Sequence, residues 1–526
     1  MARISQMAGK DFSAAMTYHE ATKHSEVSIG ASAHYLDWDN KPAQFKEYKN
    51  LASIALPRNF PRPEKNSIKA IKGEKKDADV KKIDIGVLSE LLFFSAGLTR
   101  KMRFGKEVYY MRAASATGAL YPIELYVISG RIPGLEAGVY HFNPLHFSLV
   151  RLREGDYRAA LDYAGSSDSL FAPLTLAFTS LAWRNAWKYE ARSYRHWFWD
   201  SGVIVANLLA TSNSAGIAAK AILGFADSEI DQLLSLEAKK EATVALAVVG
   251  IDHNPKALRL RQPIPSLALE INPLSREEVD YPLIWETNEA SQLRSKSEAE
   301  AWRKSLRLSQ GTTPTTTPAF PLRAWKEDLS PPLDEVILIR GSTRKFAREP
   351  ISFDHLSAIL QSSATKIPLD LLPDSETLTD FYFIANEVQG IPPGSYFYNV
   401  NTNSVEQLKV LNNRTMSGYL CLGQQLFSDA SIVFFLMTNL NSVLKSLGNR
   451  GYRVAQFEAG VRAGKIYLSS YALGNGASGS TFFDDAVTEF FSPHAEEKSP
   501  MIAVGVGVPA YKARSGKVLP QMTAKS

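Results

Sequence analysis

The sequence has only one cysteine among 526 residues, and this scarcity excludes several classes of site. A single thiol forms neither an internal disulfide nor a multi-cysteine zinc site. Cys421 stands in GYLCLGQQ, a context more typical of a buried structural thiol than of a nucleophile. His24 and His34 are too isolated to suggest metal ligands. We therefore expect no metal site.

Long apolar runs and a strong charge imbalance are also missing. No run of about 18 apolar residues is present, so we expect no membrane span. The first residues, MARISQMAGKDFSAAM, have no apolar core of the kind that a secretory signal needs. Lys and Arg number 59 and Asp and Glu 54, a net charge of +5 that is too small to indicate nucleic acid but suits an anionic ligand. These features favour a cytoplasmic enzyme or binding protein.

The chain is long enough for two or more domains, and an internal repeat divides it. WKYEARSYRHWFWDSG (187–202) and KSLGNRGYRVAQFEAG (445–460) share Arg, Tyr, Arg and Gly at a constant spacing of 258. Further upstream, ELYVIS (124–129) corresponds to DFYFIA (380–385) at a spacing of 256. The chain therefore carries two copies of one unit of roughly 200 residues.

Each copy alternates helical and strand patterns in the same order. Apolar residues at helical spacing (87–97 and 355–364) precede β-rich runs, and a long helix follows at about 192–214 and 450–472. Gly216 and Gly474 are placed to end the long helices. This order predicts an α+β fold with helices packed on mainly antiparallel sheets. The expected divisions are an N-terminal segment without a counterpart (1–86), a first domain (87–290), a Thr/Pro-rich linker (291–330) and a second domain (331–526).

RGSTRKF (340–346) stands before the first predicted helix of the second copy. Arg340, Ser342 and Arg344 form a plausible phosphate clamp, because guanidinium groups bind phosphate in a bidentate manner. A solvated charged turn is the alternative.

Two other segments of the second copy are candidates for ligand contact. GNGASG (474–479) follows a helix rather than a strand, so it is not a dinucleotide fingerprint. Gly476 there either lets the backbone approach a flat ligand or belongs to a plain helix stop. GVGVPAYKAR (505–514) places Lys512 and Arg514 after an apolar strand, where they bind a phosphate or simply add solubility.

The first copy has two candidate segments of its own. RAASATGALYP (112–122) offers the Ser115 hydroxyl and the bare backbone of Gly118 ahead of a strand, suited to ring heteroatoms or to a simple turn. Lys188 and Tyr189 move protons if burial or a charge brings their pKa toward neutrality. Most such pairs are surface residues. Here, however, the second copy keeps the Arg, Tyr, Arg and Gly pattern that follows and replaces the pair with Ser446 and Leu447.

Together these segments resemble the SagB/ThcOx-type dehydrogenases of the nitroreductase-like flavoenzyme superfamily, in their tandem double-domain form. The stretches that carry the resemblance are SAHYLDWDNKPAQFKEY (32–48), FFSAGLTR (93–100), RAASATGALYPIELYV (112–127), GVYHFNPLHFSL (138–149) and KYEARSYRHWFWDSG (188–202). The family implies FMN bound between two α+β units, here an intrachain pseudo-dimer. It also implies that FMN contacts Arg340, Ser342, Arg344, Gly476, Lys512 and Arg514 of the second copy and Ser115 and Gly118 of the first. Ala114 stands where the family usually has proline.

The resemblance implies dehydrogenation of azoline-like rings in modified peptides, with Lys188 and Tyr189 as acid–base residues and hydride passing to FMN. We expect Arg192 or Arg195 to tune the pKa values of that pair. The first copy lacks an R-x-S-x-R segment before its helix and the second lacks S-x-x-G-A-L-Y-P before DFYFIA, so we expect one FMN per chain. A cyclodehydratase is a possible partner. An NAD(P)H-dependent nitro or quinone reductase and a non-catalytic flavin- or peptide-binding module are the alternatives.

Overall fold

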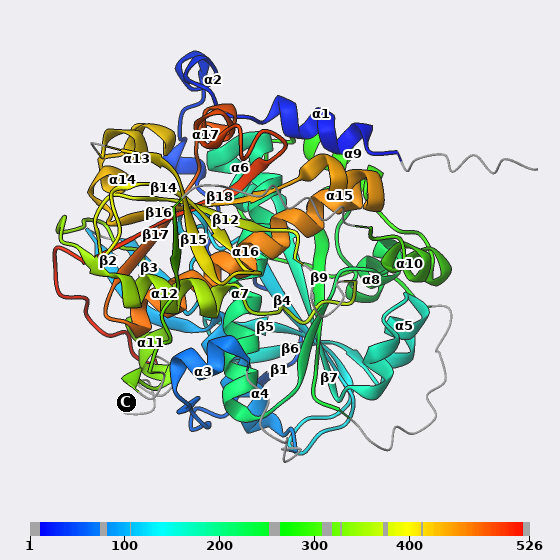
Figure 1. The fold of residues 1–526 in the computed structure, drawn as a ribbon. Coiled ribbons are helices and arrows are strands. Elements are labelled where there is room, and N and C mark those ends of the chain that lie inside the picture. Colours follow the sequence, from blue (N-terminus) through cyan, green and yellow to red (C-terminus); the bar gives the residue numbers. More distant parts are fainter. Residues whose placement is uncertain are drawn as a thin grey trace, which may run out of the picture.

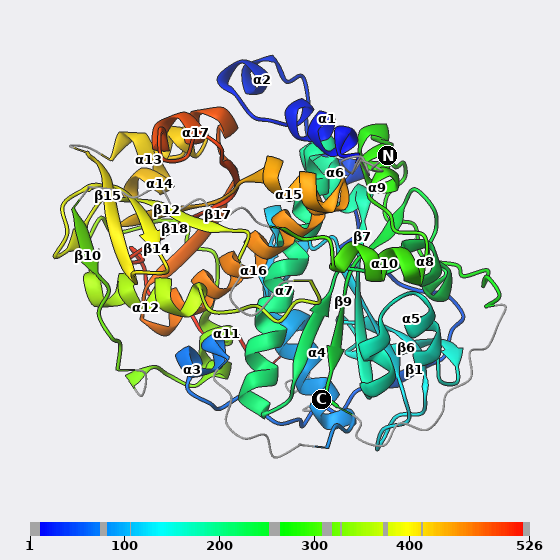
Figure 2. The same cartoon turned by 45° about the vertical axis from the view of Figure 1, so that its right-hand side comes forward.

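The computed structural model describes residues 11–73, 82–105, 107–251, 264–307, 318–326, 329–371, 377–411 and 414–518. Two seven-stranded sheets organise these residues, one in each sequence repeat, and every strand pairing within them is antiparallel. Figures 1 and 2 show the sheets on opposite sides of two long central helices, α7 and α16. The structure thus confirms the α+β prediction.

The first sheet has the order β1-β6-β5-β4-β7-β9-β8. Its strands are β1 (Ser53–Ala55), β4 (Ile123–Ser129), β5 (Gly138–Asn143), β6 (Ser148–Glu154), β7 (Leu174–Leu181), β8 (Ala219–Ile222) and β9 (Glu241–Val249). The second sheet has the order β10-β15-β14-β12-β16-β18-β17. Its strands are β10 (Ala319–Pro321), β12 (Asp380–Ala385), β14 (Gly394–Asn399), β15 (Ser404–Val410), β16 (Ile432–Thr438), β17 (Gly476–Ser480) and β18 (Ser499–Gly507).

Two small sheets and the helices complete the fold. β2 (Leu98–Phe104) pairs antiparallel with β3 (Glu107–Arg112), and β11 (Ile351–Ser352) pairs parallel with β13 (Val388–Gln389). In the first repeat and the segments flanking it the α-helices are α1 (Ser13–Ala21), α2 (Glu26–Ala31), α3 (Ser67–Lys72), α4 (Ile85–Ala96), α5 (Arg158–Tyr163), α6 (Ala182–Tyr189), α7 (Ser193–Ala215), α8 (Asp227–Leu234), α9 (Pro282–Ala290) and α10 (Lys296–Arg303). In the second they are α11 (Leu333–Ile339), α12 (Phe353–Ser363), α13 (Thr415–Leu420), α14 (Gln425–Asp429), α15 (Leu440–Leu447), α16 (Arg450–Ala472) and α17 (Asp484–Phe491). The 3₁₀ turns are η1 (Trp38–Asn40), η2 (Thr117–Ala119), η3 (Ser167–Phe171) and η4 (Glu190–Arg192).

The sheet edges show a correspondence that the sequence comparison did not detect. β1 pairs with β6 in the first sheet, and β10 pairs with β15 at the equivalent edge of the second. The N-terminal segment therefore has a partial counterpart in the second half. Residues 291–330, assigned above to a linker, contain α10 and β10, while most of the Thr/Pro-rich part (308–317) lies outside the described residues.

Helices α7 and α16 cross where two glycines of the repeat meet. A Cβ added to Gly202 would lie 2.6 Å from the Phe457 carbonyl oxygen, and one added to Gly460 would lie 2.7 Å from that of Trp199. Only glycine permits so close a backbone approach. Both helices end at glycines with positive φ, Gly216 at 71° and Gly474 at 76°, as predicted.

Buried ion pairs across this crossing explain why the repeat keeps its arginines. Arg192 and Arg195 of the first copy donate to Asp484 of the second, at 2.9 and 2.7 Å. The equivalent Arg450 and Arg453 donate to Asp227 of the first copy, at 2.5 and 2.6 Å. The arginines that both copies retain therefore hold the two domains together reciprocally through buried ion pairs.

The N-terminal helix α1 covers one end of the crossing. The ring of Tyr18 makes edge contacts with Tyr194 and its repeat equivalent Tyr452, at centroid distances of 5.4 and 5.6 Å. The Ala15 amide donates to the Asn449 side chain of the second copy at 2.9 Å. Among the described residues, no helix combines the length and the apolar character needed to cross a membrane.

Candidate functional site

A cavity of about 1340 Å³ lies between the two copies and is lined by both. It collects eight of the ten residues proposed from the sequence: Ser115, Gly118, Lys188, Tyr189, Arg340, Ser342, Arg344 and Arg514. Its lining includes seven Lys or Arg side chains and a single acidic one, Asp200. Six Tyr or Trp rings also line it, those of Tyr121, Tyr189, Trp199, Tyr467, Tyr471 and Tyr511. An excess of cations beside aromatic surface suits a flat ligand with an anionic group.

Lys188 and Tyr189 form the last turn of α6, directly before the interdomain arginines of η4 and α7. Burial and the neighbouring Arg344 lower the pKa of Lys188 below its usual value. Burial, followed by the negative charge of Asp200, raises the pKa of Tyr189 well above its usual value. The pair thus contains an amine that loses its proton more readily and a phenol that keeps its proton at neutral pH.

The sequence-based assignment of Arg192 and Arg195 as the groups that tune this pair is wrong. Both guanidinium groups are buried against Asp484, and Arg195 also donates to the His19 carbonyl at 2.9 Å. The charge that acts on Lys188 comes instead from Arg344, which belongs to the other copy. The electrostatics of the pair therefore depend on the second domain.

The segment 340–344 forms part of the cavity wall in the second copy. The Ser342 hydroxyl lies 3.4 Å from the Tyr467 hydroxyl, and the Arg344 amide donates to the Tyr511 hydroxyl at 3.0 Å. The Arg344 side chain is exposed. Within the described part of the chain it forms no ion pair, so its charge is available to an anion in the cavity.

Arg340 and Arg100 link the two walls reciprocally. The guanidinium of Arg340 donates to the carbonyls of Ala113 and Arg112 in the first copy, at 2.9 and 2.8 Å. That of Arg100 donates in return to the carbonyls of Leu338, Ile339 and Arg340 at the end of α11, each at 2.9 Å. A cation at a helix C-terminus also interacts favourably with the helix dipole. Arg100 was missed in the sequence because its partners are backbone carbonyls, which leave no pattern.

Gly476 and Lys512 are not in the cavity lining. Gly476 begins β17, and a Cβ there would collide with the Thr343 hydroxyl, so its backbone packs directly against the 340–344 segment. Lys512 is exposed on the C-terminal segment that follows β18. That segment is held to both copies, because the amides of Gly516 and Lys517 donate to the carbonyls of Leu338 and Thr99, at 2.7 and 2.8 Å.

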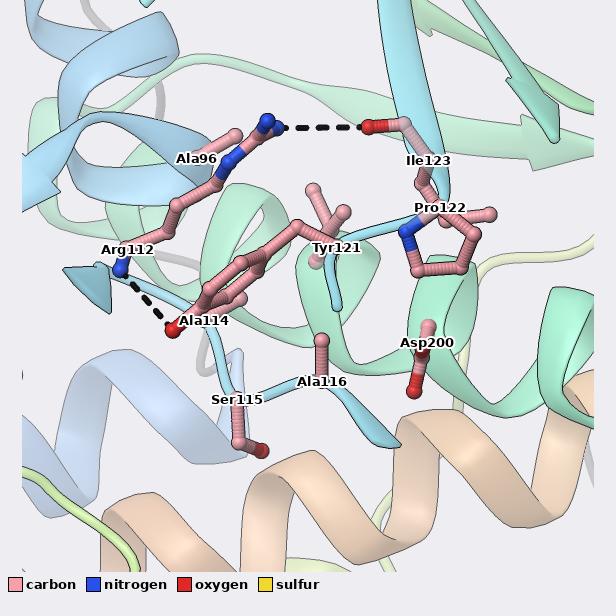
Figure 3. A pocket seen from close by; sticks show the side chains of 10 residues that line it. Ala96, Arg112, Ala114, Ser115, Ala116, Tyr121, Pro122, Ile123 and Asp200 are labelled. Atoms are coloured by element: carbon pink, nitrogen blue, oxygen red, sulfur yellow. Dashed lines mark hydrogen bonds between the residues drawn. The ribbon is translucent and has the colours of Figure 1, made fainter. Parts of the chain in front are cut away.

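Asp200 is a buried acid of the cavity that the sequence analysis did not select. Its Oδ1 accepts hydrogen bonds from the Thr117 amide and hydroxyl, at 2.9 and 2.8 Å. Burial raises the pKa of Asp200 to about 7, against the opposing effect of these bonds. Figure 3 shows it facing the loop that carries Ser115 and Ala116, beside a void of about 10 Å³. Glu458 stands 258 positions after Asp200, so an acidic residue is present at this position in both copies. That repetition is the sequence signal that would have identified Asp200.

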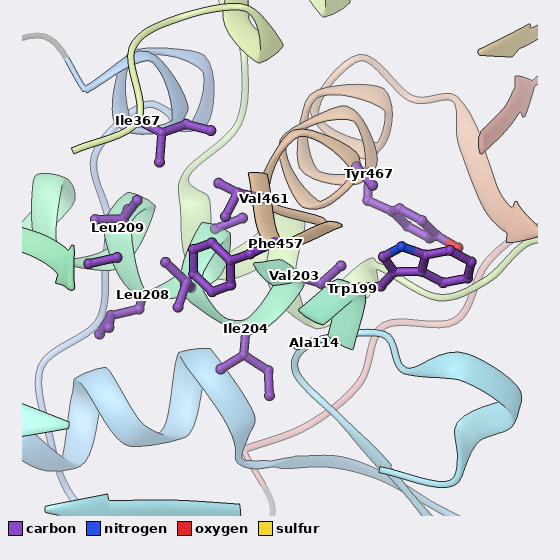
Figure 4. Close-up of a cluster of buried hydrophobic side chains, with 14 of the residues drawn as sticks. Ala114, Trp199, Val203, Ile204, Leu208, Leu209, Ile367, Phe457, Val461 and Tyr467 are labelled. Atoms are coloured by element: carbon purple, nitrogen blue, oxygen red, sulfur yellow. The ribbon is translucent and has the colours of Figure 1, made fainter. Parts of the chain in front are cut away.

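The two copies carry different side chains at equivalent positions beside the cavity. At the repeat spacing, Trp199 and Tyr467 of the cavity correspond to Phe457 and Leu209. Phe457 and Leu209 are buried in the main apolar core together with Ile367, in the same cluster that contains Trp199 and Tyr467. Figure 4 shows these three on one side of the helix crossing, with Trp199 and Tyr467 on the other. The two copies therefore differ in side-chain size and polarity at these positions.

The model of the nitroreductase family matches residues 78–251 and 337–508, which cover most of both repeats. The chain belongs to the nitroreductase family. It contains two nitroreductase domains in tandem, as the sequence predicted. A nitroreductase structure from Anabaena variabilis matches with a TM-score of 0.73 and 26% identity, over 95% of this chain and 100% of that one.

Two curated relatives are named as processing proteins. The trifolitoxin-processing protein TfxB of Rhizobium leguminosarum bv. trifolii is 28% identical over 249 residues, covering 42% of this chain and 67% of TfxB. The microcin B17-processing protein McbC of Escherichia coli is 24% identical over 252 residues, covering 46% of this chain and 87% of McbC. These similarities agree with the SagB-type resemblance read from the sequence.

Proposed function

We propose that the chain is an FMN-dependent dehydrogenase that oxidises azoline-like rings in modified peptides. One observation carries the proposal: Lys188 and Tyr189 of the first copy line the same cavity as Ser342 and Arg344 of the second. An acid–base pair and an exposed cation thus meet at one interdomain site. TfxB and McbC are named as proteins that process trifolitoxin and microcin B17, and these names support a modified peptide as the substrate.

The residues present fit FMN. Arg344 and Ser342 offer a guanidinium and a hydroxyl to its phosphate, and Arg514 adds a second cation at the same cavity. Ser115 and Gly118 lie on the opposite wall, where Ser115 would offer a hydroxyl and Gly118 its peptide groups, since the Tyr189 hydroxyl covers the Cβ side of that glycine. The volume of about 1340 Å³ exceeds that of most small-molecule sites, so it has room for a second ligand. FMN, when bound, supplies the hydride acceptor for such an oxidation.

The chain's own residues manage the proton. Oxidation of an azoline ring to an azole removes a proton from one ring carbon, the former Cα, and a hydride from the adjacent ring carbon, so a base must accept that proton. Lys188 suits the role because burial and Arg344 lower its pKa and raise the fraction of free amine near neutral pH. Tyr189 remains a neutral phenol, since its pKa is raised, and can donate a hydrogen bond to the ring heteroatom.

Turnover of an azoline-containing peptide, with flavin reduction followed by absorbance under anaerobic conditions, tests the proposal. The wild-type chain should bleach its flavin on addition of the azoline peptide and produce the azole. Lys188→Ala should retain FMN and lose turnover. Rapid bleaching by NAD(P)H with no response to azolines would instead indicate a nitro or quinone reductase, and an intact flavin that responds to neither would indicate a binding module.

A cyclodehydratase is the natural partner class for this reaction, because azolines arise by cyclodehydration of serine, threonine or cysteine side chains. We include it as part of the proposal. Co-purification of the chain with a cyclodehydratase encoded alongside it would support that part, and independent migration of the two proteins at micromolar concentration would argue against it.

A further inference from the structure

The phenol of Tyr189 lies in a narrow slot within the cavity wall. A Cβ added to Gly118 would stand 2.7 Å from the Tyr189 hydroxyl, so that hydroxyl rests directly on the glycine backbone. On another side the imidazole of His196 meets the Tyr189 ring edge-on, with centroids 4.7 Å apart and planes at 86°. Gly118 and His196 thus form two walls of the slot.

One buried amide connects the two walls. Asn185, on α6 one turn before Tyr189, is fully buried. Its Oδ1 lies 2.6 Å from His196 Nδ1, and its Nδ2 lies 3.5 Å from the carbonyl oxygen of Thr117, the residue before Gly118. The two contacts agree on the orientation of the amide, because the carbonyl can only accept and therefore faces Nδ2.

This arrangement fixes the tautomer of His196. An amide oxygen only accepts, so His196 Nδ1 carries the proton and Nε2 is a bare acceptor. Nε2 is buried and has no hydrogen-bond partner among the described residues. Burial, with the nearby Arg192 and Arg195, also lowers the pKa of His196 well below its usual value. The imidazole beside Tyr189 is therefore neutral and oriented.

The second copy distinguishes these residues from the general fold. At the spacing of 258, Asn185 and His196 become Val443 and Val454, so they disappear together with Lys188 and Tyr189. Asp200 behaves differently: its equivalent Glu458 remains acidic and accepts from the Leu378 amide at 2.8 Å and the Thr377 hydroxyl at 2.6 Å. An acid that holds the neighbouring loop is kept in both copies, whereas the Asn–His pair is confined to the copy that carries the reactive residues.

We propose that Asn185 is a positioning residue that, through His196 and Thr117, holds the Tyr189 hydroxyl in place at the cavity. The catalytic relevance of this inference rests on the proposed function, but the slot itself does not. The charged and titratable groups that face Tyr189 are Lys188 on its own helix, Asp200 and His196 on α7, and Arg344 from the second copy.

The test replaces Tyr189 with 3,5-difluorotyrosine in the full chain and records its ¹⁹F spectrum across pH. We expect the otherwise wild-type chain to give one resonance pattern, with a titration midpoint above that of the free amino acid. Asn185→Val, which installs the second copy's residue, should give several resonances or a shifted one and a lower midpoint. Asn213→Val is the matched control. The side-chain amide of Asn213 also donates one hydrogen bond to a carbonyl, that of Ala70 at 3.1 Å, but Asn213 lies in the last turn of α7.

Asn185→Asp is the second variant, since it is nearly isosteric and should fold if the valine variant does not. Its carboxylate favours protonation of His196, and the resulting charge should lower the Tyr189 midpoint. A Tyr189 spectrum and midpoint that are unchanged in the Asp variant, or in a folded Val variant, would overturn the inference.

Activity measurements on unlabelled protein add a second readout. Asn185→Val should lower kcat about 10²-fold with little change in KM or flavin content, the effect of a group displaced by roughly 1 Å. His196→Val should have a similar effect, and the double variant should be little worse than either, because both act on one slot. Full additivity of the two losses would contradict the shared role. Failure of the dehydrogenase proposal would leave the ¹⁹F result intact, so the two ideas can be separated.

Discussion

Replacing Asp484 with asparagine should destabilise the chain strongly, because this carboxylate neutralises two buried guanidinium groups. It is 1% exposed and accepts from Arg192 at 2.9 Å, from Arg195 at 2.7 Å and from the His24 amide at 2.8 Å. Removing one partner of a buried ion pair costs about 3–5 kcal/mol, since the remaining charge stays buried without compensation. A domain is typically stable by only about 5–15 kcal/mol, so the change is a large fraction of the total.

The neighbouring residue provides a matched control. Asp485 is 80% exposed and pairs with Lys23 at 2.8 Å. An exposed pair of this kind contributes about 1 kcal/mol or less, so Asp485→Asn should be nearly neutral. Urea unfolding followed by far-UV circular dichroism measures both variants. A loss for Asp484→Asn no larger than that for Asp485→Asn would refute the view that the repeated arginines form an interdomain clamp.

The pH dependence gives the same prediction a second check. Asp484's pKa is held below its ordinary value by Arg192 and Arg195, against the opposing effect of burial. Its contribution is therefore fully present above the unfolded-state pKa of about 3.9 and is lost as pH falls through the folded-state value. The difference in unfolding free energy between wild type and Asp484→Asn should stay constant from about pH 5 to 8 and shrink in strong acid. A difference that grows on acidification would contradict the assignment.

Three further predictions concern the cavity. Arg344→Gln removes a cation that lowers the pKa of Lys188, so the acid limb of kcat/KM should move to higher pH in a pH–rate profile. Arg323→Gln, at an exposed pair between the linker and the second domain, should not move it. Gly118→Ala places a methyl group 2.7 Å from the Tyr189 hydroxyl and should lower kcat at least 10-fold. Gly216→Ala is the control, because Gly216 also has a positive φ but has nothing within 4 Å, and it should cost only about 1 kcal/mol of stability and no activity. Equal kcat values for the two variants would contradict the close packing of Tyr189 on Gly118. Arg100→Met removes donors to three carbonyls at the end of α11 and should weaken FMN binding measured by fluorescence titration, with an unchanged Kd counting against the reciprocal link between the walls.

Much of the architecture was predictable because the repeat records it directly. The constant spacing between Tyr194 and Tyr452 revealed two domains, and the helix-ending glycines were read correctly from their place after apolar periodic segments. The edge strands β1 and β10 were not found, because three residues paired at a sheet edge carry too little pattern to be recognised.

The site was predictable where chemistry resides in side-chain type and not where it resides in tertiary contacts. Lys188, Tyr189 and the arginines of 340–344 stood out as reactive or anion-binding types, and the structure brings them to one cavity. The partner of Arg195 was assigned wrongly because Asp484 lies 289 positions away, and helix neighbours in sequence say nothing of contacts across the crossing. Asn185 and His196 escaped notice because their contribution depends on an amide bridging two elements, which only the folded chain displays.

The flavin stoichiometry of the purified chain tests the central claim most directly. The claim is that the two copies form one composite site, because the second copy replaces Lys188 and Tyr189 with Ser446 and Leu447 and the first copy lacks the R-x-S-x-R segment of the second. Absorption of released FMN against protein concentration, after saturation with FMN and removal of the excess, should give about one flavin per chain. Two flavins per chain would show that both positions bind, and none would show that the cationic cavity serves a different ligand.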